Sequence, residues 1–264
     1  MEHKILHAGN LGSFYKYINS KLSCKSGMGP IQEASGNLIP DDLHKANLMN
    51  DFFASMWIPD DGLSPPFRAT LPDNHQPLNE ITFSQQSTCK HLLKLKGSLA
   101  SGSDNLPPLF FKTLAVNLAS AVTMLNRRIF ATGELPVMWK SGFVTPIFKK
   151  GCSSDPCNYR PITLTCVSCK IFETAIKEQV LKYMIANNLI NAKQHGFIGG
   201  YSTCTNLLES VNDWTINLKN RSCTRVAFIH FKRAFDSVCF NKLISKLSKY
   251  GIGGNLICNQ IVFI

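Results

Sequence analysis

Residues 226–236 read V-A-F-I-H-F-K-R-A-F-D, and this run is the most informative motif of the chain. Its first half is rich in β-branched and aromatic residues, which is typical of a buried strand. We therefore expect a strand over residues 225–231. A helix over about 238–250 should follow, and Gly251 stands where a glycine would end it.

Upstream of this run, helices and a strand alternate from residue 110 onward. Apolar residues recur at helical spacing over 111–129, and a Gly-Glu-Leu-Pro turn at 133–136 ends that helix. A short strand is expected at 142–148, where Pro146 indicates an edge or a bulge. Further helices, each packing one face inward, are expected at about 168–187 and 204–219.

Residues 1–88 are expected to form a separate region that precedes this alternation. An amphipathic helix is expected at about 41–56, where Asp41 and Asp42 would favour the start of the helix dipole. A Pro-rich stretch at about 59–79 has neither the helical nor the strand period and predicts a linker. Neither Asp41-Asp42 nor Asp60-Asp61 is predicted to be a catalytic pair, since the first suits a helix cap and the second a turn.

Charge is distributed unevenly along the chain. The net charge is +11 overall, but residues 1–88 carry 6 basic and 9 acidic side chains. Residues 89–264 carry 22 basic and 8 acidic side chains, a net charge of +14. Such a surplus favours a polyanionic partner, because each phosphate neutralised by Lys or Arg releases counterions. A merely basic, soluble surface would give the same count.

Ten cysteines could indicate disulfides, but the first residues lack the apolar core of a signal peptide. We therefore expect a reduced intracellular protein, in the nucleus or the cytoplasm, and not a secreted one. Cys166 and Cys169 form a C-x-x-C pair without a second pair at zinc-ribbon spacing, so we expect no metal site there. No segment approaches the roughly 20 apolar residues of a membrane span, so no membrane partner is expected.

Several short motifs occur in a fixed order between residues 101 and 236. They are S-G-S-D-N-L-P-P at 101–108, G-E-L-P at 133–136, V-T-P-I-F-K-K-G at 144–151, N-Y-R-P-I-T-L at 158–164, Q-H-G-F at 194–197, G-Y-S-T at 200–203 and the run at 226–236. In this order and at this spacing, they resemble the reverse transcriptases of non-LTR (LINE-type) retrotransposons, of the jockey-like kind. The resemblance covers roughly residues 90–255, and residues 10–62 resemble the connector that precedes the polymerase in such polyproteins.

The resemblance implies an α+β, mainly helical fold for the chain. Residues 89–264 would form an incomplete right-hand polymerase, comprising the fingers and the first palm strand. Residues 1–88 would be the connector region. No Tyr-x-Asp-Asp box follows residue 236 in this sequence, so we expect the domain to be truncated before that box.

Three residues match nucleotide-binding positions of the family. A planar, always-charged guanidinium suits bidentate phosphate contact, so Arg160, in an expected Tyr-Arg-Pro turn, is the candidate triphosphate ligand, with Lys149 as its helper. Phe235 stands where the family places a bulky side chain under the nucleotide sugar. The alternatives are an ordinary surface arginine at 160 and a core aromatic beside Val238 at 235.

One departure from the family concerns the metal. His230 occupies the position at which the family has a metal-binding aspartate, and a neutral imidazole lacks the charge and hardness that Mg²⁺ requires. Asp236 lies beyond the expected strand end, so we expect it to hydrogen-bond the following turn or helix start. Mg²⁺ is expected for the family, but we assign no metal ligand and no intact catalytic residue here.

Further departures lie at the Gly-Phe turn that follows His195. The family has basic residues around this turn, whereas this chain has Ile198 and Tyr201. His195 itself is expected to be a hydrogen-bonded structural histidine rather than a catalytic base.

Three hypotheses about function follow. The first is a fragment of a retrotransposon reverse transcriptase, ancestrally copying an RNA template onto a DNA primer from deoxynucleoside triphosphates by two-metal transfer, and inactive by itself. The second is a non-catalytic nucleic-acid-binding module that binds RNA in a salt-dependent manner. The third is a non-functional transposon relic, whose unpaired strand edge and apolar surface would promote aggregation.

Overall fold

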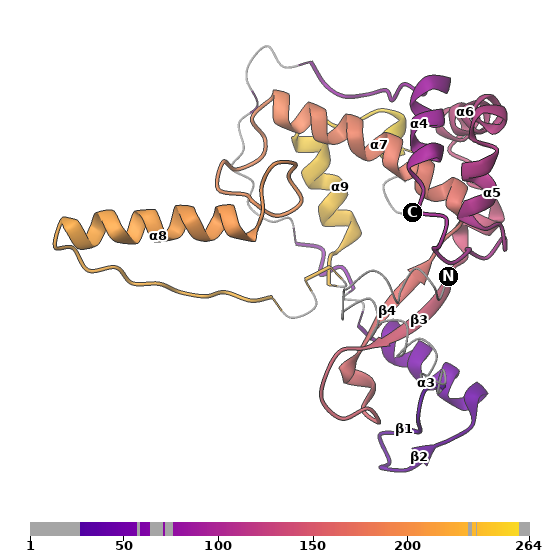
Figure 1. Ribbon diagram of the computed structural model, residues 1–264, viewed down its shortest axis with the longest axis horizontal. Helices are drawn as coiled ribbons and strands as arrows, with labels where there is room; N and C mark the ends of the chain where they lie inside the picture. The colour runs from indigo at the N-terminus through magenta and orange to yellow at the C-terminus, as the bar shows by residue number, and fades with distance from the viewer. Residues whose placement is uncertain are drawn as a thin grey trace, which may run out of the picture. The chain divides into compact units, whose positions relative to one another are not determined.

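The computed structural model divides the chain into two compact units (Figure 1). Unit 1 comprises the chain up to Ser55 together with Pro146–Ile162, and unit 2 comprises Met56–Thr145 and Thr163–Ile264. The structure describes residues 27–56, 59–63, 71, 76–231, 234–235 and 237–258.

Unit 1 contains a short hairpin and one helix. Strands β1 (Ile31–Gln32) and β2 (Leu38–Ile39) pair antiparallel. Helix α3 (Asp42–Ala54) follows, and the carboxylate of Asp41 caps it by accepting a hydrogen bond from the N–H of His44 at 2.9 Å. The expected helix at 41–56 and the capping role of the first aspartate pair are therefore confirmed.

Two further strands form a second two-stranded sheet, the β3–β4 ribbon, and are drawn side by side in Figure 1. Strand β3 (Phe143–Phe148) agrees with the strand expected at 142–148, and both strands of a two-stranded sheet are edges, which accommodates Pro146. Its partner β4 (Tyr159–Leu164) lies where the sequence suggested a Tyr-Arg-Pro turn. That expectation was wrong, because Arg160 and Pro161 lie within the strand that pairs with β3.

Unit 2 is built mainly from helices. The predicted helix over 111–129 is present but interrupted at Leu114, and Gly133 ends it in the left-handed conformation with φ 70°. The helix expected at 168–187 is confirmed. The structure also has a helix at 85–94, which the sequence analysis did not predict. The elements from this part of the chain are α4 (Gln85–Lys94), α5 (Pro108–Thr113), α6 (Ala115–Thr132), the 3₁₀ turn η1 (Val137–Lys140) and α7 (Val167–Ala186).

The core of unit 2 centres on the fully buried Phe172 of α7. Its ring stacks on that of Phe83 with centroids 5.5 Å apart. The ring of Trp139 is tilted relative to that of Phe172, and these two centroids are also 5.5 Å apart. Trp139 also donates its indole N–H to the hydroxyl of Ser168 at 3.0 Å, so the polar atom of this large side chain is satisfied. These contacts fix α7 against the segments that precede α4 and β3.

Helix α8 (Thr203–Lys219) agrees in position with the helix expected at 204–219, but it buries no residue. Its apolar side chains remain exposed, with Leu207 59%, Leu208 70% and Leu218 74% accessible. The expectation that this helix packs one face inward was wrong for the part of the chain that the structure describes. A periodic apolar stripe predicts a helix, but it cannot specify the surface that would cover the stripe.

The strand expected at 225–231 is not formed. Residues 222–231 have neither helical nor strand conformation, and Phe228 and Ile229 are 90% and 80% exposed. A strand requires a hydrogen-bonded neighbour, and no described residue pairs with this segment. The first palm strand is therefore absent from the described residues, although the chain is mainly helical with small sheets, as expected.

The end of the described chain returns to the core of unit 2. Helix α9 (Phe240–Lys249) confirms the helix expected at 238–250, and Gly251 follows with φ 74°. Ile252 bridges Leu78 and is 2% exposed. A last short helix is α10 (Asn255–Cys258). None of the described helices combines the length and the apolar character needed to cross a membrane.

Candidate nucleic-acid interface

The β3–β4 ribbon carries both basic residues predicted to bind a nucleotide. Lys149 follows the last residue of β3, and its N–H donates to the carbonyl oxygen of Asn158 at 2.8 Å. Arg160 is the second residue of β4. Both side chains are exposed, and within the described residues neither makes a hydrogen bond or an ion pair. The structure therefore brings two unengaged cations onto one ribbon.

The loop that connects these strands is internally hydrogen-bonded. The carboxylate of Asp155 accepts from the N–H of Cys157 at 2.8 Å and so caps the 3₁₀ turn η2 (Pro156–Asn158). The hydroxyl of Tyr159 donates to the carbonyl of Ser153 at 2.6 Å, while its ring is buried. This scaffold orders the backbone beneath the two cations, which lowers the entropic cost of binding an anion.

Phe235 lies in unit 2 and is 76% exposed, so the alternative of a core aromatic beside Val238 does not describe it. Its ring meets that of Phe197 edge to face, with centroids 5.8 Å apart and an interplanar angle of 77°. Lys149 and Arg160 belong to unit 1. The structure thus unites the two cations, and it places the aromatic candidate in a different unit.

The residues at the expected metal position do not fit a magnesium site. His230 is exposed in the irregular segment, and an imidazole is a poor ligand for Mg²⁺. Among the described residues, no three His, Cys, Asp or Glu side chains gather in a way that could hold a metal ion. Asp236, for which the sequence predicted a hydrogen bond to the next turn or helix start, lies outside the described residues.

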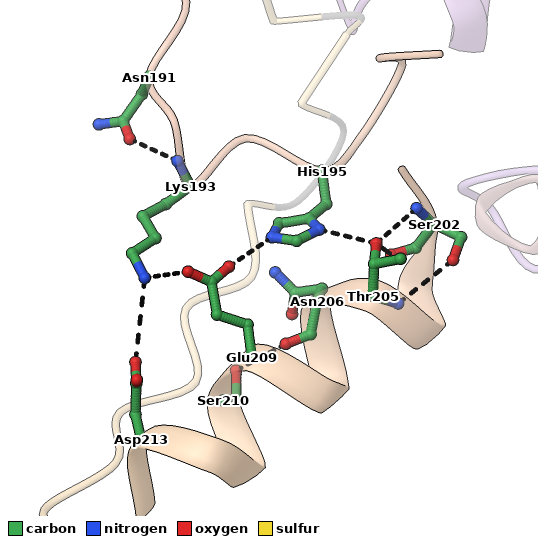
Figure 2. Close-up of polar contacts among 9 residues, drawn as sticks. All are labelled: Asn191, Lys193, His195, Ser202, Thr205, Asn206, Glu209, Ser210 and Asp213. Atoms are coloured by element: carbon green, nitrogen blue, oxygen red, sulfur yellow. Dashed lines mark hydrogen bonds and ion pairs between the residues drawn. The ribbon is translucent and has the colours of Figure 1, made fainter. Parts of the chain in front are cut away.

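A polar network centred on His195 joins the loop before α8 to that helix (Figure 2). The Nδ1 atom of His195 lies 2.9 Å from the hydroxyl of Thr205, and Nε2 lies 2.8 Å from a carboxylate oxygen of Glu209. The ring is 9% exposed and meets Tyr201 edge to face at 5.0 Å. Both ring nitrogens are engaged, which confirms the prediction of a hydrogen-bonded structural histidine.

The helix start beside this network is capped twice. The Ser202 hydroxyl accepts from the N–H of Thr205 at 3.2 Å, and the Thr205 hydroxyl accepts from the N–H of Ser202 at 2.8 Å. This reciprocal arrangement is a capping box, in which two backbone donors that the helix cannot satisfy find partners. The sequence Ser202-Thr-Cys-Thr205 therefore explains where α8 begins.

Electrostatics reinforce the same junction. Lys193 forms an ion pair with Glu209, and its Nζ lies 3.9 Å from a carboxylate oxygen of Asp213 (Figure 2). Hydrogen bonds from Lys193 and then from His195 hold the pKa of Glu209 below its ordinary value of 4.5. The bond to Glu209 in turn raises the pKa of Lys193. The loop at 191–195 is thus held to α8 by charge-assisted hydrogen bonds.

Cys166 and Cys169 are both buried at the start of α7 and are unpaired thiols. Cys166 donates to the carbonyl of Met138 at 3.3 Å, whereas Cys169 lies 3.7 Å from a carboxylate oxygen of Glu173. Burial first, and then the neighbouring Glu173, raise the pKa of the Cys169 thiol. A buried thiol in such surroundings is inert, so this pair acts as packing rather than as a reactive motif.

The second aspartate pair is structural as well. Asp60 and Asp61 accept hydrogen bonds from the N–H groups of Gly62 and Leu63, as expected of a turn. Asp60 also accepts from the side-chain amide of Asn241 at 2.7 Å, which is the main cause of its lowered pKa. These aspartates tie the described part of the predicted linker to the start of α9.

Phe197 is the residue of this region that the sequence reasoning missed. It is 79% exposed and adopts φ 65°, a left-handed conformation that is uncommon outside glycine. The sequence carried one signal, since Gly196 and Gly199-Gly200 flank it and indicate a sharp turn. Nothing in that pattern showed that the ring would face solvent.

Comparisons with known proteins show similarity to reverse transcriptases. A family model described as "Reverse transcriptase (RNA-dependent DNA polymerase)" matches residues 147–263. The chain is 27% identical over 190 residues to the "Probable RNA-directed DNA polymerase from transposon BS" of Drosophila melanogaster, covering 72% of this chain and 20% of that protein.

Two further Drosophila melanogaster proteins are similar. The "RNA-directed DNA polymerase from mobile element jockey" is 27% identical over 189 residues, covering 71% of this chain and 20% of that protein. The "Probable RNA-directed DNA polymerase from transposon X-element" is 26% identical over 148 residues, covering 56% of this chain and 16% of that protein. The chain thus spans about a fifth of the length of these relatives. The chain is therefore similar, over part of its length, to the reverse transcriptases of non-LTR (LINE-type) retrotransposons.

Proposed function

We propose that the chain descends from an enzyme that extends a DNA primer on an RNA template, and that it is inactive by itself. The observation that carries the proposal is the family match over residues 147–263, and the sequence resemblance, which sets His230 at the position of the metal-binding aspartate, supports the inactivity. Two-metal nucleotidyl transfer requires hard, negatively charged ligands that bridge the ions. The family uses a divalent metal such as Mg²⁺, and no step through that metal is assigned to this chain.

In this proposal, Arg160 and Lys149 are the contacts for the triphosphate of an incoming deoxynucleotide. Their exposure and the hydrogen-bonded loop between β3 and β4 support this role, because both side chains are open to a phosphate and the backbone of the loop between them is already ordered. Phe235 would lie under the nucleotide sugar, which its 76% exposure permits. Residues 89–264 would act as the partial polymerase domain and residues 1–88 as its connector, inside the cell.

Primer extension tests the catalytic part. The chain would be joined to the C-terminal polymerase half of the jockey relative, with His230 or with His230→Asp, and assayed on an RNA template with Mg²⁺ and deoxynucleotides. We expect incorporation only with the aspartate, because only the carboxylate can hold the metal. Equal incorporation with either residue would show that position 230 holds no metal, and incorporation by the unmodified chain alone would overturn its inactivity.

A second candidate function is a nucleic-acid-binding module without catalysis. The net charge of +14 over residues 89–264 favours it. Binding of a labelled RNA would then weaken steeply as salt rises, with a slope set by the number of phosphates that the protein neutralises. Replacing Arg160 by Gln should reduce that slope by about 1, as should replacing Lys149. Aggregated protein that neither binds nor extends would support a non-functional relic.

A further inference from the structure

The Phe197–Phe235 pair is an aromatic surface held open to solvent. The two rings are 79% and 76% exposed, yet they contact each other edge to face. In such a pair at most one face of either ring is covered by the other ring, so each ring keeps at least one face open. Exposed aromatic faces in a basic protein are the surfaces on which unpaired nucleobases stack.

The backbone of Phe197 indicates that the position of this ring matters. A bulky residue at φ 65° costs conformational free energy that glycine would not. The conformation gains no burial for the ring, which remains almost entirely in solvent. A strained residue whose side chain is presented outward rather than packed inward is typical of a ligand contact.

The turn that carries Phe197 is fixed on both sides. On one side, the side-chain amide of Gln194 donates to the carbonyl of Gly196 at 3.0 Å, and His195 is bound to α8. On the other, the N–H of Tyr201 donates to the carbonyl of Ile198 at 3.2 Å. The backbone that carries the ring is therefore ordered in advance, so that a ligand need not order it.

Positive charge lines a cavity to which Phe197 also contributes. Phe197 borders a cavity of about 600 Å³ that α7, the loop at 189–198 and α9 line. The charged side chains in its lining are Lys177 and Lys246, both cations. A base stacked on Phe197 would bring its flanking phosphates to a surface of favourable charge.

We propose that Phe197, supported edge-on by Phe235, is a stacking site for an unpaired base of single-stranded nucleic acid. The proposal deepens the nucleic-acid binding proposed above and rests on it. It assigns binding to an aromatic ring in a turn whose neighbouring residues Ile198 and Tyr201 carry no charge.

The test uses the full chain and short single strands labelled with fluorescein, in which one base is 2-aminopurine, whose emission falls when it stacks. Phe197→Ala and Phe197→Gly should weaken binding by roughly 5- to 150-fold, the range expected for one lost base stack. The salt slope should not change, because no phosphate contact is removed. Phe197→Tyr keeps the ring and should bind within about twofold of the unaltered chain.

Two controls separate binding from folding. Phe197→Gly relieves the left-handed backbone, so its unfolding midpoint should equal or exceed that of the unaltered chain while its binding weakens. Phe228→Ala removes an even more exposed phenylalanine from the irregular segment and should leave affinity unchanged. An oligonucleotide with abasic sites should be insensitive to Phe197→Ala, since it offers no base to stack.

The outcomes are distinct. If Phe197→Ala loses affinity for both oligouridylate and oligothymidylate, the site binds single strands of either kind. If it loses affinity for only one of them, the site is selective for RNA or for DNA, respectively. Salt-dependent binding that Phe197→Ala leaves unchanged, or that Phe228→Ala weakens equally, would overturn the stacking site and leave the proposed function standing. A chain that binds no nucleic acid at low salt would overturn both.

Discussion

The imidazole of His195 lies 2.8 Å from the carboxylate of Glu209, which joins a buried loop residue to the middle of α8. The same ring reaches the hydroxyl of Thr205, one turn earlier on the helix. Because α8 buries no residue, these hydrogen bonds and the Lys193 ion pairs are the described side-chain contacts that hold the helix to the preceding loop.

We therefore expect His195→Ala to destabilise the protein by about 1–3 kcal/mol, the cost of losing hydrogen bonds at a buried site and of leaving partners unsatisfied. Urea unfolding measures this. His44→Ala is the matched control, since His44 is exposed and lies 3.6 Å from Asp41, and it should change stability by less than about 0.5 kcal/mol. Equal effects of the two substitutions would show that the His195 network is not structural.

The lowered pKa of Glu209 predicts a pH dependence. A carboxylate whose pKa is lower in the folded state stabilises that state fully above its ordinary value of 4.5. The contribution is lost as the pH falls through the lowered folded value. The difference in urea midpoint between the unaltered chain and Glu209→Gln should therefore be constant near neutral pH and shrink below about pH 4.5. A difference that is independent of pH would contradict this assignment.

Elements with a strong apolar period were predictable from the sequence, and those that depend on partners were not. Helices α3, α7, α8 and α9 lie where the period placed them. In α4, however, the buried side chains include the polar Thr88 and His91, so the helix has no clear apolar period in the sequence. Thr88 accepts from Thr123 at 2.8 Å, a contact that exists only after α4 packs on α6.

The failures at 225–231 and β4 have the same physical origin. Residues 225–231 have strand propensity without a described neighbour, and β4 forms despite Pro161 because β3 pairs with it. Strand propensity depends on the residues of the segment itself, whereas a strand's ladder of hydrogen bonds also depends on a neighbouring strand. At the candidate site, sequence could name Arg160 and Lys149, but a left-handed phenylalanine such as Phe197 has no sequence period to reveal it.

Gly102 explains one motif of the sequence in steric terms. A Cβ atom at this position would lie 2.5 Å from the backbone N of Cys166, so only glycine allows this approach. Next to it, the hydroxyl of Ser103 donates to the carbonyl of Met138 at 2.9 Å. Gly102→Ala should destabilise unit 2 by about 1–3 kcal/mol or more, because a backbone atom cannot move aside as a side chain can.

Gly199→Ala is the control for this prediction, since a Cβ there meets no atom within 4 Å and its backbone is not left-handed. It should change the free energy of unfolding by less than about 0.5 kcal/mol. Thermal or urea unfolding of both variants distinguishes close packing from a general penalty of replacing glycine. A stable Gly102→Ala protein would show that the approach to α7 is looser than described.

The exposed apolar stripe of α8 predicts self-association. Leu207, Val211 and Leu218 recur at spacings of four and seven residues and are 59%, 44% and 74% exposed. Contiguous exposed apolar surface binds hydrophobic dyes and promotes association. Leu218→Lys should lower the fluorescence of bound ANS and the apparent mass in light scattering, without loss of stability, because the side chain is already in solvent.

Asn212→Lys makes the same change of charge off this stripe and tests whether charge alone is responsible. Asn212 is exposed on α8, and a lysine there leaves every apolar residue of the stripe in place. If both variants reduce association equally, net charge rather than apolar contact governs solubility. If Leu218→Lys alone does so, the stripe is the surface that causes association, and its spacings of four and seven residues indicate that another helix is the partner best suited to cover it.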